Sequence, residues 1–194
     1  MSNTIVLIRH GQPTILLQGW IGGRELPQFV SRYQAAGIAE GSLPSEDVKS
    51  LVRSAKAVFT SDLLRAVHSA KILEPTVTPM VDPIFREAEF WFEFPINLRL
   101  PCPIWIGLAK LLWGLGYSGH CESLLDANNR AKKAAELLEQ RSHEVSTVVL
   151  VGHGLTNLLI TRELRKRGWR GSPIPNFGNW GCTTYHLALD SESN

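Results

Sequence analysis

The sequence predicts an α/β protein, a three-layer sandwich with a mostly parallel central sheet and helices on both faces. Two apolar runs, Ile5–Ile8 and Val148–Val151, have the length and composition of buried strands. Helix-compatible segments alternate with these and other short strand-like runs, which is the order expected of a layered α/β sheet. With 194 residues, the chain has the length of one domain with a substantial core.

The individual elements follow from hydrophobic spacing and from turn residues. A long loop is expected over residues 12–27, which contain Pro13 and three glycines. Ser61 or Asp62 is expected to cap a helix that runs to Leu73, since the apolar residues after them recur at helical spacing. Further helices are expected at 28–37, 45–55, 122–141 and 155–167. The expected strands cover 4–9, 57–60, 76–81, 147–152 and 182–189.

The least regular part of the sequence lies between residues 84 and 121, which hold eight aromatic side chains and several prolines. We expect a single domain over residues 1–194, with an aromatic and proline-rich insertion or lid at about 90–121. The simplest interpretation of this segment is a cover that completes the core. The more specific interpretation is a lid over a pocket, whose aromatic side chains select an organic phosphate with an apolar portion.

The composition narrows the class of protein. Charged residues make up 20% of the chain, apolar residues 44%, and the formal net charge is only +2. This balance is typical of a folded globular protein, and it gives no reason to expect a nucleic-acid partner. Cys102, Cys121 and Cys182 are widely spaced, so neither a disulfide framework nor a zinc ribbon is expected. The first strand begins near Thr4, which leaves no room for a signal peptide and indicates a cytoplasmic location.

No integral membrane segment is expected. The most apolar stretch, residues 103–117, is shorter than the roughly 20 residues of a spanning helix, and Lys110 interrupts it. Surface contact with a membrane is a weaker alternative. It would use the aromatic segment together with a basic cluster near the end of the last helix, which we expect to face solvent. That cluster comprises Arg162, Arg165, Lys166, Arg167 and Arg170.

Two histidines follow predicted strands directly. His10 lies in Arg9-His10-Gly11 after the first strand, and His153 lies in Gly152-His153-Gly154 after the strand at 147–152. In an open α/β sheet, ligands bind beyond the carboxyl ends of the strands. The two imidazoles are therefore expected to face one pocket.

A histidine beside an arginine suits phosphoryl chemistry. A neutral imidazole can take a phosphoryl group and form a covalent intermediate, while guanidinium groups bind the phosphate oxygens in bidentate fashion. Arg65, in the first turn of a predicted helix, offers a second guanidinium. Glu87, in a stretch compatible with a β-strand, offers a proton donor for the leaving oxygen.

Taken together, these motifs resemble the signature of the histidine phosphatase superfamily, which has the phosphoglycerate-mutase-like fold. The Arg9-His10-Gly11 and Gly152-His153-Gly154 segments match its two histidine motifs. Residues 61–66, Ser-Asp-Leu-Leu-Arg-Ala, match its second motif, and residues 85–87, Phe-Arg-Glu, resemble the segment that supplies the acid. Glu122-Ser123-Leu124 resembles the segment that opens the helix before the second histidine.

The resemblance implies a role for each site residue. His10 would be the phosphorylated nucleophile, and Arg9, Arg65 and His153 would form the phosphate pocket. Glu87 would protonate the leaving oxygen and then help to activate water. No metal ion and no cofactor are implied. Glu89 is an alternative proton donor, because residues two apart on a strand share a face.

The expected function is that of a metal-independent phosphatase that hydrolyses small phosphomonoesters through a phosphohistidine on His10. The sequence departs from the family pattern after its first motif, at Gln12, Pro13 and Leu16, and after the acid, at residues 89–93. These departures leave the substrate open. The alternatives are a phosphoprotein phosphatase acting on phosphohistidine, a phosphotransferase of the phosphoglycerate mutase type, and a non-catalytic phosphate-binding or scaffold protein.

Overall fold

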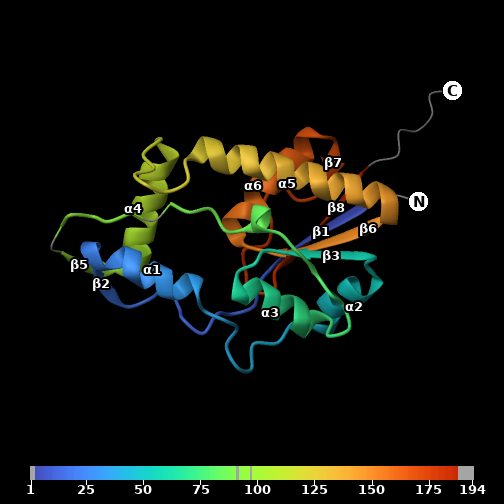
Figure 1. The fold of residues 1–194 in the computed structure, drawn as a ribbon, viewed down its shortest axis with the longest axis horizontal. Helices are drawn as coiled ribbons and strands as arrows, with labels where there is room; N and C mark the ends of the chain where they lie inside the picture. Colours follow the sequence, from blue (N-terminus) through green and yellow to red (C-terminus); the bar gives the residue numbers. More distant parts are fainter. Residues whose placement is uncertain (1–2, 91, 97, 188–194) are drawn as a thin grey trace.

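The computed structural model describes residues 3–90, 92–96 and 98–187. A six-stranded sheet in the order β4-β3-β6-β1-β8-β7 lies at its centre (Figure 1). Strands β4, β3, β6 and β1 are parallel, and β8 runs antiparallel to both β1 and β7. The predicted mostly parallel sheet is thereby confirmed. The bounds are β1 Thr4–Arg9, β3 Ala57–Thr60, β4 Met80–Val81, β6 Thr147–Gly152, β7 Trp169–Arg170 and β8 Cys182–Leu187.

Helices cover both faces of this sheet, because alternate side chains of each strand point to opposite faces. Ile5 and Leu7 pack in one core with α5 and α6, whereas Val6 and Ile8 pack in another core with α2 and α3. Figure 1 shows α5 and α6 on one side of the strands and α3 on the other. The three-layer α/β sandwich is as the sequence predicted. These helices are α2 Glu46–Ser54, α3 Leu64–Leu73, α5 Leu124–Val145 and α6 Gly154–Lys166.

The remaining elements gather at one end of the molecule, away from the chain termini (Figure 1). They are the helices α1 Leu26–Gln34 and α4 Cys102–Gly114, the paired strands β2 Trp20–Gly22 and β5 Arg99–Pro101, and the 3-10 turn Gly23–Glu25. A second 3-10 turn, Pro83–Phe85, lies near the centre of the molecule and packs against α5 (Figure 1). Trp105 of α4 donates its indole N–H to the Ile21 carbonyl, and Trp113 donates to the Glu122 carbonyl. Part of the aromatic segment therefore extends the core. Its role as a lid, and the single-domain assignment, stay predictions.

Several expected boundaries were wrong for identifiable reasons. The strand at 76–81 is reduced to Met80–Val81, since Pro79 cannot donate to a ladder and Thr76 folds back onto Glu74. The loop at 12–27 contains β2 and the start of α1. Leu63, rather than Ser61 or Asp62, is the N-cap of α3, because Ser61 and Asp62 have other partners, as described below. Positions 188–189 of the last expected strand lie outside the described residues.

The helices of the described part offer no segment long and apolar enough to cross a membrane. The three cysteines are free thiols. Within the basic cluster, Lys166 pairs with Glu163, and Arg167 pairs with both Glu136 and Glu139. These ion pairs support the interpretation of that cluster as a solvated helix end.

Candidate active site

The centre of the candidate site is His10, which follows β1 at the point where β6 also ends. The register pairs Arg9 with Gly152, so His10 and His153 emerge from neighbouring parallel strands. Their ring centroids lie 5.2 Å apart. The two imidazoles are therefore neighbours, but neither lines the cavity described below, so the expectation that they face one pocket stays a prediction.

The hydrogen bonds of His10 define its tautomer. Arg65 can only donate, and its Nε lies 3.3 Å from His10 Nε2, so Nε2 must be an acceptor. His10 Nδ1 then donates to the carbonyl oxygen of Gly11 at 2.7 Å. The ring is consequently held neutral, with the lone pair of Nε2 directed toward the Arg65 guanidinium.

The pKa of His10 is lowered from 6.5 to about 3. Burial is the main cause, because the side chain is only 1% exposed, and the positive charges of Arg65 and Arg9 add to it. The imidazole of His10 is therefore unprotonated near neutral pH, which is the state that a nucleophile requires.

His153 is fully buried beside His10. Its Nε2 lies 2.7 Å from the hydroxyl of Ser61, which also accepts a hydrogen bond from the Leu63 amide. This contact explains why Ser61 does not cap α3. Burial, then the charge of Arg65, holds the pKa of His153 well below its ordinary value. The second ring nitrogen, Nδ1, is buried without a hydrogen-bond partner.

The two arginines reach the histidines from different elements. Arg9, at the end of β1, donates from Nη1 to the carbonyl of Phe177, while its Nε is buried without a partner. A buried donor without a partner costs roughly 1–3 kcal/mol. Arg9 Nε and His153 Nδ1 are thus two buried polar atoms that an anion with several acceptor oxygens would satisfy.

The Arg65 guanidinium is fully buried at the start of α3, and burial lowers its pKa. Its outer nitrogens donate to the backbone carbonyls of Tyr33 and Gln34 and, at 2.8 Å, to the side-chain oxygen of Gln34. The group also stacks over the Tyr33 ring at 4.8 Å. The Arg65 guanidinium, which we expected to bind phosphate, therefore donates its hydrogen bonds to residues at the end of α1.

Glu87 lies at the N-terminus of α6. Its carboxylate accepts hydrogen bonds from the amides of Thr156 at 2.9 Å and Leu155 at 3.4 Å, and from the Thr156 hydroxyl at 3.2 Å. Glu87 follows a 3-10 turn, so the expected strand at this position was wrong. Glu87 and Glu89 nevertheless line one shallow hollow together, and the choice between them as proton donor stays a prediction. Glu89 is exposed and its amide contacts Glu122, outside the cavity described below.

Sequence reasoning missed the group that holds the Glu87 segment in place. Arg130 of α5 forms a two-pronged ion pair with Glu122 and donates to the carbonyls of Ile84 and Arg86. Arg86 in turn pairs with Asp62, which lowers the pKa of the Asp62 carboxyl. The sequence signal for the Arg130–Glu122 ion pair was the resemblance of the segment at Glu122 to a family motif.

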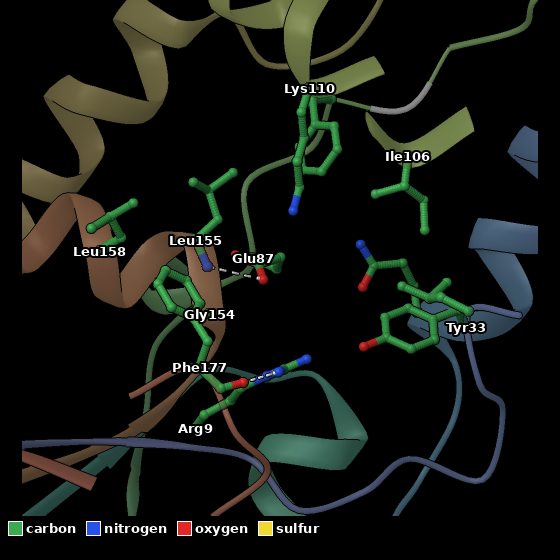
Figure 2. Close-up of a pocket in the computed structure, with 12 residues that line it drawn as sticks. Arg9, Tyr33, Glu87, Ile106, Lys110, Gly154, Leu155, Leu158 and Phe177 are labelled. Atoms are coloured by element: carbon green, nitrogen blue, oxygen red, sulfur yellow. Dashed lines mark hydrogen bonds between the residues drawn. The ribbon is translucent and has the colours of Figure 1, made fainter. Parts of the chain in front are cut away.

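A cavity of about 520 Å³ opens beside these residues (Figure 2). Arg9, Glu87, Tyr33 and Gln34 reach its surface, whereas His10, Arg65 and His153 lie behind this wall and are almost completely buried. The four groups that the sequence assigned to an anion site are therefore adjacent, but the cavity itself reaches only Arg9 among them. Within the described ranges, no cluster of His, Cys, Asp or Glu side chains is arranged to hold a metal ion.

Solved structures with a similar fold cover nearly the whole chain. A mycobacterial glucosyl-3-phosphoglycerate phosphatase matches with a TM-score of 0.62 and 20% identity, over 95% of this chain and 90% of the other. A phosphoserine phosphatase mutant from Entamoeba histolytica, in complex with phosphoserine, matches with a TM-score of 0.58 and 19% identity, over 93% and 89%. The protein YhfR of Bacillus stearothermophilus matches with a TM-score of 0.59 and 18% identity, over 98% of both chains.

No protein-family model matches the sequence, and no curated protein matches it. The likeness is therefore one of fold, at low sequence identity. The chain shares the fold of these solved structures, which is the fold that the resemblance of its motifs implied.

Proposed function

We propose that this protein is a metal-independent phosphatase that hydrolyses small phosphomonoesters through a phosphohistidine on His10. The observation that carries the proposal is the neutral His10 ring, whose Nε2 lone pair is held beside the Arg65 guanidinium and the His153 ring. A neutral nitrogen nucleophile surrounded by cationic and donor groups suits attack on a phosphate dianion.

The phosphate group would bind between His10 and the two arginines. Arg9 Nε and His153 Nδ1 are available as contacts for phosphate oxygens, since both are buried without a partner. Arg65 would turn toward the phosphate once the Gln34 side chain leaves its outer nitrogen. An Arg–phosphate contact is charge-assisted on both sides, so it is stronger than a contact to a neutral amide.

In the first chemical step, His10 Nε2 attacks the phosphorus and the bond between phosphorus and the ester oxygen breaks. The Glu87 carboxyl gives a proton to the leaving oxygen, which departs as the alcohol. In the second step, the Glu87 carboxylate takes a proton from water as the water oxygen attacks the phosphorus. The phosphorus–nitrogen bond then breaks, inorganic phosphate is released, and both His10 and Glu87 return to their starting states.

Two further features support a small organic substrate. Phe90 and Ile106, from the segment at 90–121, line the same cavity as Glu87, which supports the role of this segment as a cover. Two of the similar structures are phosphatases, one for glucosyl-3-phosphoglycerate and one bound to phosphoserine. We extend to this chain only the general class, a phosphomonoester substrate.

Steady-state kinetics on a panel of phosphomonoesters tests this proposal. We expect turnover without added metal, inhibition by vanadate, and loss of at least roughly 10³-fold in kcat for His10→Ala. Glu87→Gln should lower kcat strongly, while Glu89→Gln, whose carboxylate lies outside the cavity, should retain most activity. Full turnover by His10→Ala would refute the proposal, and phosphate binding without any turnover would favour the non-catalytic alternative.

A further inference from the structure

The cavity beside Glu87 has a wall that the proposed reaction does not use. Leu17, Phe90, Ile106, Leu155 and Leu158 contribute apolar side chains to it. Binding cavities of roughly 300–1,000 Å³ with mainly apolar walls hold small organic ligands, and this one has about 520 Å³. Since a phosphate group itself has no apolar surface, this wall is available for the organic part of the substrate.

One cation lies in this apolar wall. Lys110 extends from α4 into the cavity, on the side of Glu87 opposite Arg9 (Figure 2). Among the described residues its ammonium forms no ion pair, and its contact is with the Phe90 ring, at 5.8 Å from the ring centroid. A cation over an aromatic ring is a weak contact where water has access.

We propose that the substrate carries a second anionic group, at the far end of its apolar portion, and that Lys110 binds it. The proposal rests on the proposed function for the place of the phosphate, at Arg9 and His10. Glu87 then lies at the ester oxygen, the apolar wall holds the organic part, and Lys110 meets the distal anion. The substrate class is a phosphomonoester with an apolar body and a terminal carboxylate or comparable anion.

A different use of Lys110 has a different signature. If Lys110 contacted the transferred phosphate, removal of the lysine would lower kcat/KM for every phosphomonoester by the same factor. If Lys110 only stabilised α4 against Phe90, its removal would not distinguish substrates by their charge. Only a contact with a distal anion makes the effect of Lys110 depend on the far end of the substrate.

The test compares alkyl phosphates with ω-carboxyalkyl phosphates of the same chain length. For the wild-type protein we expect kcat/KM to be roughly two- to fivefold higher with the terminal carboxylate, because Lys110 is exposed and an ion pair that water reaches is weak. Lys110→Met should abolish this preference, and Lys110→Glu should reverse it. Lys133→Met, which removes an exposed lysine of α5 that does not line the cavity, should leave the preference unchanged.

The same ligands are also compared by calorimetric titration of the His10→Ala variant, which separates binding from turnover. Equal kcat/KM and equal affinity for the two series would overturn the role of Lys110 while leaving the phosphatase proposal intact. If Lys110→Met lowered kcat/KM by the same factor for alkyl phosphates and for ω-carboxyalkyl phosphates, the role of Lys110 would also be overturned. If the protein turned over neither series but still bound ω-carboxyalkyl phosphates more tightly than alkyl phosphates, the phosphatase proposal would be refuted and the distal anion site supported.

Discussion

Arg65 donates a hydrogen bond of 2.8 Å from Nη2 to the side-chain oxygen of Gln34. The contact joins the N-terminal end of α3 to the C-terminal end of α1, and it occupies a guanidinium that we assign to the substrate phosphate. Gln34 also lines the cavity, so an entering anion and Gln34 compete for the same donor.

Removal of this competitor is expected to strengthen anion binding. In Gln34→Ala, the inhibition constant for inorganic phosphate should fall about fivefold, since one net hydrogen bond of roughly 1 kcal/mol no longer has to be broken. Competitive inhibition kinetics measures this change. Gln28→Ala, at an exposed position of the same helix, is the control. An unchanged or increased inhibition constant would show that Gln34 does not oppose phosphate.

The ion pair between Arg130 and Glu122 is expected to act on catalysis through Glu87. Arg130→Met frees the carbonyls of Ile84 and Arg86, so the carboxyl of Glu87 loses its fixed position. Proton donation matters most when the leaving alcohol is poor. We therefore expect kcat to fall by roughly 10–100-fold for alkyl phosphates and far less for p-nitrophenyl phosphate.

The leaving-group dependence separates this role from a loss of folding. Arg141→Met removes another arginine of α5, one that pairs with Glu144 and does not contact the Glu87 segment, and it should not change the dependence on the leaving group. A uniform loss of rate for all esters in Arg130→Met would contradict a positioning role.

The buried His10 predicts a specific dependence of stability on pH. Its pKa is about 3 in the folded protein and 6.5 in the unfolded chain, so the unfolded chain binds the proton first as the pH falls. The stability associated with neutral His10 is complete above pH 6.5 and is lost progressively between pH 6.5 and 3. Between pH 6 and 4 the slope is about 1.4 kcal/mol per pH unit.

Urea unfolding of wild type and His10→Asn across this range measures the slope. His153 contributes a loss in the same direction, because its pKa is also lowered, but it is present in both proteins. The difference between the two free energies of unfolding should therefore change with pH mainly by the contribution of His10, since burial and Arg65, the larger causes of the lowered His153 pKa, are present in both proteins. Parallel curves of unfolding free energy against pH for the two proteins would contradict a strongly lowered pKa of His10.

Substitution of alanine at two glycines should change the stability of the fold in opposite directions. A Cβ at Gly11 would lie 2.2 Å from the Trp180 ring, so Gly11→Ala should destabilise the fold by roughly 1–3 kcal/mol. A Cβ at Gly107, exposed in α4, would meet nothing within 4 Å, so Gly107→Ala should stabilise by about 0.5–1 kcal/mol. Thermal unfolding of both variants measures these changes, and a stabilised Gly11→Ala would refute the packing of Trp180.

Much of the fold was predictable because its strands are continuous apolar runs. Ile5–Ile8 and Val148–Val151 lie buried on both faces, and the residue after each strand is then fixed at the same edge of the sheet. That is why His10 and His153 were found together. Their catalytic roles, and those of Arg9 and Arg65, remain proposals.

Other parts of the site depend on contacts between distant segments, which periodicity does not encode. The Gln34 contact arises where α1 ends, and the boundaries of α1 were predicted only approximately. Glu87 was found from its motif, but its position at the start of α6 comes from backbone amides of Leu155 and Thr156. Arg130 was missed because an arginine on a long amphipathic helix usually faces solvent.

The formation of a phosphohistidine on His10 is the central claim, and an acid-sensitive covalent label tests it most directly. A labelled phosphomonoester is mixed with the protein, the reaction is quenched by denaturation at alkaline pH, and the labelled peptide is identified. We predict label on the peptide that contains His10, stable to alkali, released by acid, and absent from His10→Ala. Label on another residue, or full turnover by His10→Ala without any label, would contradict the account.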